Sequence, residues 1–182
     1  MLLKLYQLML ERKIKIVPKH LMIICSEVDE NFKRFLNWCR KFGIREITIC
    51  ANSLQVKLEN VKLNFIDEKN FYSTGDGDIT INIVRNSGRK EMVIAIREIA
   101  EKVLKGELDA EKIDENVFES VLKLRSQPDM IIKAGSEVPD FLIWQSIYSE
   151  LYFTDIDWRT VRYVDFLRIL REYQRRERRY GR

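Results

Sequence analysis

The sequence is poor in the residue types that build metal clusters and hydrolytic triads. It holds one histidine, His20, and three cysteines among 182 residues. A single histidine excludes a metal centre made of several imidazoles and argues against a Ser-His-Asp triad. Cys25, Cys39 and Cys50 are odd in number and lie in apolar patterns. We therefore expect buried, reduced thiols rather than a redox or zinc site.

Long hydrophobic runs are also absent. Apolar runs such as LMIIC at 21–25 fall far short of the roughly 18 to 20 residues that span a bilayer. Near the N-terminus, charged and polar side chains interrupt the apolar residues at helical spacing: Lys4, Gln7, Glu11 and Arg12. Since this pattern is unlike a signal peptide, we expect a cytoplasmic protein that does not cross a membrane.

The N-terminal segment nevertheless has an amphipathic pattern. Over residues 2–13, one helical stripe collects Leu3, Tyr6, Met9 and Leu10. We expect this helix to pack on the protein's own body. Contact with a membrane surface is the alternative.

Phosphate-binding glycine patterns are missing. The loop YSTGDGD contains Gly75 and Gly77, but it has neither the GxGxxG nor the GxxxxGK spacing, so we predict a turn there. The sequence also has no internal repeat and no low-complexity linker. With 46% apolar residues the chain can bury a core, and we expect residues 1–182 to form one domain.

The positive charge is concentrated at the C-terminal end. The chain has a net charge of +4, and residues 168–182 contain seven arginines against two glutamates. We define residues 171–182 as the basic tail, which is either a solvated helix end or a contact for an anionic ligand or partner. A nucleic-acid partner is not expected, because Tyr173 and Tyr180 are the only aromatic residues interleaved with these charges.

Strand and helix patterns alternate along the chain. Short β-rich runs occur at 20–25, 45–50, 63–66, 78–84, 129–134 and 150–153. Helical patterns occur at 32–43, 89–105 and 114–124, after Pro139, and from about residue 163. This alternation predicts an α/β domain with a mainly parallel central sheet flanked by helices.

Particular words of the sequence carry a family resemblance. Between Ser126 and Gly181 the chain contains PDMIIKAGSE, FLIWQ, YSELYFTD and DFLRILREYQRRERRYG. These words resemble the C-terminal part of the cis-prenyltransferases, the undecaprenyl and dehydrodolichyl diphosphate synthases. Weaker similarity at 18–24, 38–53 and 82–106 extends the resemblance over nearly the whole chain, and the N-terminal part is most similar to archaeal members.

The resemblance implies the undecaprenyl diphosphate synthase-like fold and a dimer that condenses isopentenyl diphosphate with an allylic diphosphate, using Mg²⁺. In the family, an Asp in a DGN(G/R)RW-like motif after the first strand holds the allylic diphosphate and Mg²⁺. The alignment places Ser26 at this position, and a neutral hydroxyl is a poor ligand for Mg²⁺. Glu27, Asp29 and Glu30 are expected to cap and charge the next helix, with compensation for the missing Asp as the alternative.

Three further departures affect the substrate site that the resemblance implies. The chain runs from Ser26 to Phe32 almost at once, which leaves little of the family's phosphate loop. Between Ile66 and Ile79 it lacks the long helix that helps wall the product tunnel, although each buried methylene contributes about 0.8 kcal/mol to holding a prenyl chain. Lys133 replaces the first arginine of an RTGGE-like run, and a second arginine is missing, so bidentate diphosphate contacts are lost.

Other elements of the family are retained. Arg179, Tyr180 and Gly181 match the RxG element, which in the family reaches across the dimer interface to the neighbour's isopentenyl diphosphate and metal. The dimer interface is expected to involve four aromatic residues: Trp144, Tyr148, Tyr152 and Phe153. Candidate residual contacts for phosphate or metal are Lys133, Glu150 and Arg89, each with an ordinary structural role as the alternative.

This combination is similar to the accessory subunits of heteromeric cis-prenyltransferases, such as the Nogo-B receptor in dolichol synthesis. It implies a non-catalytic subunit without a cofactor of its own, paired in a heterodimer or heterotetramer with a catalytic homologue that binds Mg²⁺ and makes long-chain polyprenyl diphosphate. The alternative is an active, short-tunnel enzyme that works as a homodimer.

Overall fold

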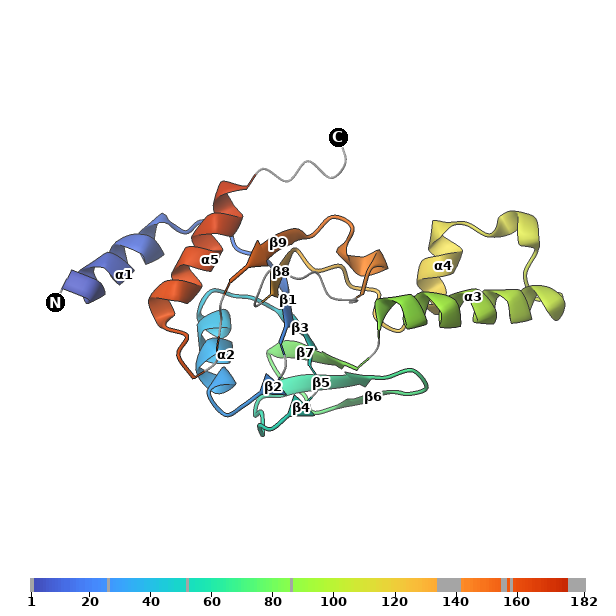
Figure 1. Ribbon diagram of the computed structural model, residues 1–182, viewed down its shortest axis with the longest axis horizontal. Coiled ribbons are helices and arrows are strands. Elements are labelled where there is room, and N and C mark those ends of the chain that lie inside the picture. The colour runs from blue at the N-terminus through green and yellow to red at the C-terminus, as the bar shows by residue number, and fades with distance from the viewer. Residues whose placement is uncertain are drawn as a thin grey trace.

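The computed structural model describes residues 2–25, 27–51, 53–85, 87–133, 142–154, 157 and 159–176. In these residues a seven-stranded sheet runs in the order β6-β5-β7-β3-β1-β8-β9 (Figure 1). In this order the strands span Phe71–Thr74, Val61–Ile66, Ile79–Val84, Glu46–Cys50, His20–Ile24, Met130–Lys133 and Glu150–Phe153. Every neighbouring pair is parallel except β5 with β6. The predicted α/β fold with a mainly parallel sheet is confirmed.

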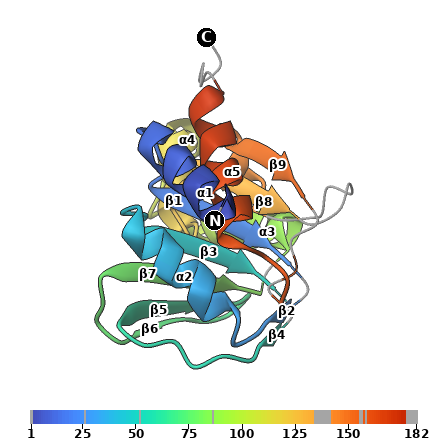
Figure 2. The same cartoon turned by 90° about the vertical axis from the view of Figure 1, so that its left-hand side faces the viewer.

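The helices lie on both sides of this sheet. They are α1 (Leu2–Lys13), α2 (Phe32–Lys41), α3 (Gly88–Leu104), α4 (Glu115–Val121) and α5 (Tyr163–Arg175). Helices α1, α2 and α5 gather on one side, whereas α3 and α4 lie on the opposite side (Figures 1 and 2).

Strand β1 shows why the central strands are continuous apolar runs in the sequence. Leu21 and Ile23 pack into a large cluster with α2 and α5, while Met22 and Ile24 belong to a second cluster that includes Leu124 and Leu142. Both faces of the sheet are therefore buried, as expected for parallel strands.

Aromatic packing joins α2 to α5. In α2 the buried side chains recur at helical spacing: Phe32, Phe35, Leu36 and Cys39. The ring of Phe35 meets Phe166 of α5 edge-to-face at 5.2 Å between centroids, and both side chains are fully buried. Burying a side chain of this size contributes roughly 1.5–3 kcal/mol, so this contact fixes α5 against the rest of the core.

Helix α1 packs on α5 through only part of its surface. Leu10 is buried, and the Gln174 side chain of α5 donates to the carbonyl of Lys13 at 2.9 Å. Glu11 pairs with Lys41 of α2 at 2.9 Å. None of the helices in the described part of the chain has the length and apolar character that crossing a bilayer requires.

The structure differs from the sequence prediction in its shortest elements. Residues 72–74, the first part of the loop predicted as a turn, belong instead to the exposed strand β6. Strand β5 supports β6 through a stacked Phe65–Tyr72 pair at 4.7 Å. Two short strands, β2 (Glu27–Val28) and β4 (Ser53–Leu54), pair with each other in a small parallel sheet. The helix predicted after Pro139 falls partly outside the described residues, and the described part contains the 3-10 turn Trp144–Ser146.

Candidate functional site

The carboxyl ends of β1 and β8 mark the place where a ligand site is expected. From β1 the chain crosses to β3 on one side, whereas β8 pairs with β1 on the other side, so the strand order reverses between β1 and β8. Open α/β sheets bind ligands outside the carboxyl ends of the strands at such a point. Ile24 is in register with Lys133, and it is also in register with Cys50 of β3. The sequence-predicted position Ser26 follows Ile24 by two residues but lies outside the described residues.

The described side chains at this edge do not fit Mg²⁺. Cys25 and Cys50 are thiols that form no disulfide, and burial raises the pKa of Cys50 to about 12, so it stays neutral. Lys133 adds a positive charge at the end of β8. Within the part of the chain that the structure describes, there is no group of three or more His, Cys, Asp or Glu side chains that could hold a metal ion. Mg²⁺ prefers anionic oxygen ligands, which this edge does not supply in its described residues.

The acidic residues after Ser26 serve the local chain. The Asp29 carboxylate accepts from the backbone N–H of Asn31 at 2.8 Å, immediately before α2. Glu30 forms an ion pair with Lys33 in the first turn, and this contact lowers the pKa of Glu30. Glu27, predicted to cap the helix, lies instead in β2. These contacts favour the structural role of Asp29 and Glu30 over the alternative of metal binding.

Strand β2 occupies the sequence position of the family's phosphate loop. Val28 pairs in register with Leu54, and its side chain is fully buried in the main core cluster. A diphosphate loop instead presents successive backbone N–H groups to its ligand. Because Val28 anchors this segment in the core and its backbone pairs with β4, the segment does not form such an open cradle.

The three candidate contacts for phosphate or metal do not converge. Lys133 is in register with Phe153 at the carboxyl ends of β8 and β9, while Glu150 is in register with Met130 at the amino ends. Three residues of strand separate the two positions by about 10 Å. Arg89 lies in the first turn of α3, after β7.

Glu150 binds a local base, which was the structural alternative for this residue. Its carboxylate accepts from Arg176 at 3.2 Å, and both side chains are half-buried. Arg176 also donates to the Leu151 carbonyl at 2.5 Å. This arginine caps the C-terminal end of α5. Arg176, the last residue of the basic tail that the structure describes, is thus held against β9. Arg179, Tyr180 and Gly181 lie outside the described residues.

A buried polar pair, Gln145 with Glu91, was not predicted from the sequence. Gln145 donates to the Glu91 carboxylate at 3.1 Å and to the Leu124 carbonyl at 2.8 Å, and both side chains are buried. Burial raises the pKa of Glu91. The pair joins the first turn of α3 to the turn before β9. The signal in the sequence is weak, because Glu91 looks like an ordinary first-turn acid of an exposed helix.

Strand β9 and the turn before it expose a group of apolar side chains. The exposed members are Ile143, Ile147, Tyr148, Leu151 and Phe153. In the described residues β9 ends the sheet order, so it presents an edge. Exposed edges with apolar side chains are typical of strands that meet another chain. Of the other predicted interface residues, Tyr152 is half-buried, and Trp144 packs on Phe118 of α4 at 4.5 Å.

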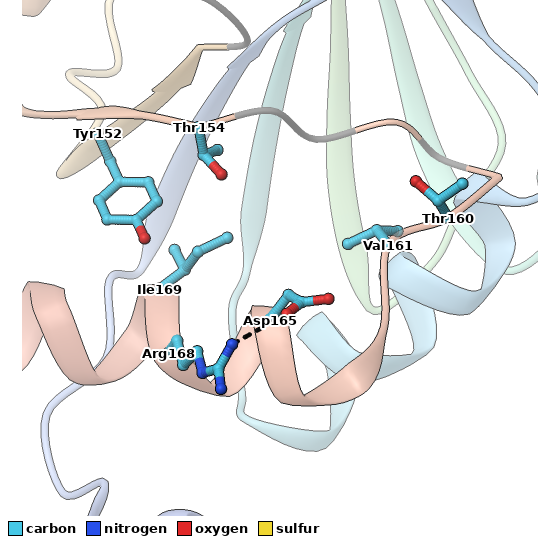
Figure 3. A pocket seen from close by; sticks show the side chains of 7 residues that line it. All are labelled: Tyr152, Thr154, Thr160, Val161, Asp165, Arg168 and Ile169. Atoms are coloured by element: carbon cyan, nitrogen blue, oxygen red, sulfur yellow. Dashed lines mark hydrogen bonds and ion pairs between the residues drawn. The ribbon is translucent and has the colours of Figure 1, made fainter.

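A cavity of about 330 Å³ lies between β9 and α5 (Figure 3). It is lined by Tyr152, Thr154, Thr160, Val161, Asp165, Arg168 and Ile169. The Asp165 carboxylate accepts from Arg162 at 3.0 Å, and this contact lowers the pKa of Asp165. Arg168 approaches the same carboxylate at 3.5 Å. The carboxylate in this described lining is therefore already ion-paired, which disfavours a role for it in acid-base chemistry.

Comparisons with known proteins agree with the fold. The structure superposes on lavandulyl diphosphate synthase from Lavandula x intermedia with a TM-score of 0.71 and 23% identity, covering 91% of this chain and 99% of that one. It superposes on a probable undecaprenyl diphosphate synthase from Campylobacter jejuni with a TM-score of 0.69 and 18% identity, covering 92% and 100%. At these identities the similarity establishes the fold.

Sequence comparison establishes the family. A relative from Methanocaldococcus jannaschii, named tritrans,polycis-undecaprenyl-diphosphate synthase (geranylgeranyl-diphosphate specific), is 32% identical over 248 residues, covering 98% of this chain and 89% of the relative. A synthase of the same name from Methanopyrus kandleri is 46% identical over 103 residues, covering 54% and 38%. The family model described as putative undecaprenyl diphosphate synthase matches residues 57–181. The chain therefore belongs to the cis-prenyltransferase family.

Proposed function

We propose that the chain is a non-catalytic subunit of a heteromeric cis-prenyltransferase. It pairs with a catalytic homologue that makes long-chain polyprenyl diphosphate, and it contributes Arg179 and Gly181 of its basic tail to that homologue's isopentenyl diphosphate site. Mg²⁺ is bound in the partner's site and not in this chain.

The observation that carries the proposal is the chemistry at the carboxyl ends of β1, β3 and β8. The described side chains there are the thiols Cys25 and Cys50 and the cation Lys133, and β2 folds the following segment into the core. Ionisation of an allylic diphosphate needs a metal held by anionic oxygens, together with a set of N–H donors around the phosphates. The described part of this edge offers neither.

The length of the chain supports the same conclusion. The alignment with the Methanocaldococcus jannaschii synthase runs over 248 residues, so at least 66 of its positions have no counterpart in a chain of 182 residues. In the structure the connection between β5 and β7 is a hairpin with the exposed strand β6. A four-residue exposed strand cannot wall a tunnel for a long prenyl chain, which needs an extensive apolar lining.

Two features at the β9 edge support pairing with a second subunit. Tyr148, Leu151 and Phe153 expose apolar area at the β9 edge, where a second subunit can dock. Within the basic tail, Arg176 is held beside the same strand by its ion pair with Glu150. A guanidinium offers five donors to phosphate oxygens, and a glycine permits close backbone approach, so the tail suits a diphosphate across an interface.

The test is a condensation assay with isopentenyl diphosphate, geranylgeranyl diphosphate and Mg²⁺. The chain is assayed alone, and then mixed with the full-length family member of the same genome. We expect no turnover by the chain alone and a large gain of activity in the mixture, which Arg179→Ala abolishes. Arg182→Ala is the matched control, because it removes the same charge from the same tail outside the RxG element. Equal activity of the two variants would count against the proposal.

A second function is an active, short-tunnel cis-prenyltransferase that works as a homodimer. The names of the relatives favour it, since the synthases from Methanocaldococcus jannaschii and Pyrococcus horikoshii each align with 98% of this chain. In this case the purified chain turns over an allylic diphosphate without any homologue. The first half of the same assay separates the two functions.

A further inference from the structure

Helix α1 exposes a group of large apolar side chains on one side. The exposed fractions are 82% for Leu2, 66% for Leu5, 53% for Leu8 and 45% for Met9. Residues 2, 5 and 9 follow one another at spacings of three and four, so they share one side of the helix, with Leu8 next to it. Scattered apolar residues on a surface are common, but a contiguous exposed group marks a contact site.

The orientation of α1 is fixed by its opposite side. Leu10 is buried against the body of the protein, and Glu11 pairs with Lys41 at 2.9 Å. Gln174 of α5 donates to the Lys13 carbonyl and accepts from the Ile16 N–H at 3.0 Å. These contacts hold the end of α1 beside α5, so Leu2, Leu5 and Leu8 are left exposed, and Figure 1 places the N-terminus at one extreme of the molecule.

Basic side chains border this apolar side. A groove of about 370 Å³ runs between α1 and α5, and its lining includes four cations, Lys13, Arg168, Arg171 and Arg175, against the single carboxylate of Glu172. Arg168 also lies over the Tyr6 ring at 6.0 Å. A neighbouring hollow is lined by Leu5, Leu8, Met9, Arg12 and Lys13. Met9 and Lys13 line both, so the apolar side of α1 and the basic groove form one continuous surface, which we call the α1–α5 face.

We propose that the α1–α5 face docks on the surface of a bilayer that contains anionic lipids. Its leucines reach the boundary between headgroups and acyl chains, while Lys13, Arg171 and Arg175 contact the lipid phosphates. An apolar helix side bordered by cations is the pattern of interfacial helices. Each basic side chain close to an anionic surface increases partitioning by about fivefold, which favours a lipid surface over an uncharged apolar partner. The inference is independent of the proposed function, because it concerns a different surface.

Vesicle flotation with the full chain tests whether the α1–α5 face binds anionic lipids. The probes are phosphatidylcholine vesicles with and without phosphatidylglycerol. We expect the wild type to float with the anionic vesicles only, and binding to decrease with added salt. Leu5→Gln/Leu8→Gln is expected to weaken binding at least tenfold, and Arg171→Gln/Arg175→Gln is expected to weaken it similarly and flatten the salt dependence. Leu104→Gln is the matched control, because Leu104 of α3 is 87% exposed and lies on the opposite side of the sheet.

Three results would contradict docking of the α1–α5 face on anionic lipids. No flotation with anionic vesicles, equal flotation with neutral vesicles, or an equal loss in Leu104→Gln would overturn the proposal. Sedimentation equilibrium tests the alternative that the α1–α5 face binds a second copy of the chain, because it measures whether the chain dimerises. A dimer that Leu5→Gln/Leu8→Gln dissociates, together with no vesicle binding, would assign the face to self-association instead. Circular dichroism of each variant checks that these exposed substitutions leave the fold intact.

Discussion

Arg176 and Glu150 form an ion pair of 3.2 Å that ties the end of α5 to the first residue of β9. The same arginine donates to the Leu151 carbonyl, so the chain leaves α5 in a fixed position at the edge of the sheet. This edge also carries the exposed apolar side chains Tyr148 and Phe153. In the proposed subunit, the pair therefore sets where the chain leaves α5 relative to the partner.

Arg176→Met is expected to reduce the activation of the catalytic homologue several-fold without preventing pairing. The half-buried ion pair is worth about 1 kcal/mol at most, so the fold survives while the tail loses its anchor. Arg175→Met is the control, because this neighbouring arginine is exposed and pairs only loosely with Glu172 at 4.0 Å. Activity of the mixture and co-elution on gel filtration are the two measurements. A loss of co-elution in Arg176→Met would show that the residue acts in docking instead.

Phe153→Lys is expected to abolish pairing through β9. A lysine at an exposed edge position introduces a charge that must lose water in an interface, and natural edge strands use lysine to avoid association. Phe71→Lys on β6 is the matched control, since it places the same exposed substitution at the opposite edge of the sheet. Analytical ultracentrifugation measures the association. If both variants associate like the wild type, β9 is not the interface.

Phe35→Ala is expected to lower the free energy of unfolding by about 3–5 kcal/mol. The side chain is fully buried between α2 and α5, where it meets Phe166 edge-to-face. Phe71→Ala removes an exposed ring, and a surface change of this kind is expected to cost less than about 0.5 kcal/mol. Urea denaturation compares the two. Similar losses in the two variants would contradict the packing described for α2 and α5.

His20 is expected to make stability depend on pH. Burial lowers the pKa of His20 below 6.5, although Glu46 and Asp129 act in the opposite direction. The folded chain then binds this proton more weakly than the unfolded chain. The free energy of unfolding therefore decreases as the pH falls below 6.5, until the lowered folded pKa is reached. His20→Gln keeps an amide near the Thr48 hydroxyl, which the imidazole contacts at 2.7 Å, and removes the titration.

The measurement for His20 is the slope of unfolding free energy against pH below 6.5 in wild type and His20→Gln. Because His20 is the one histidine of the sequence, the difference between the two slopes isolates its contribution. A slope that is the same in both proteins would show that burial does not disfavour the imidazolium.

The fold was predictable because its central strands have a strong local pattern. Runs such as LMII are apolar throughout, since Leu21 and Met22 meet different buried faces, and helix α2 repeats its apolar residues at helical spacing. Strand β6 was not predictable, because its residues are all exposed and its pairing with β5 is a tertiary contact. Strands β2 and β4 are two residues long, which is too short for any periodicity.

The candidate site was predictable only in part, for the same reason. The sequence placed Ser26 after one strand and Lys133 near the end of another, and the structure puts these two strands side by side, since Ile24 and Lys133 are in register. Long-range polar partners leave no local pattern. Two such pairs are recognised only in the folded structure. Glu150 and Arg176 are 26 residues apart in the sequence, and Glu91 and Gln145 are 54 residues apart.

The central claim is that this chain does not hold an allylic diphosphate itself. Isothermal titration of geranylgeranyl diphosphate into the purified chain with Mg²⁺ tests it most directly. The proposed subunit predicts no saturable binding, which corresponds to a Kd weaker than about 1 mM, and saturable binding once the catalytic homologue is added. Magnesium-dependent binding of one ligand per chain at micromolar concentration, without the homologue, would contradict the account.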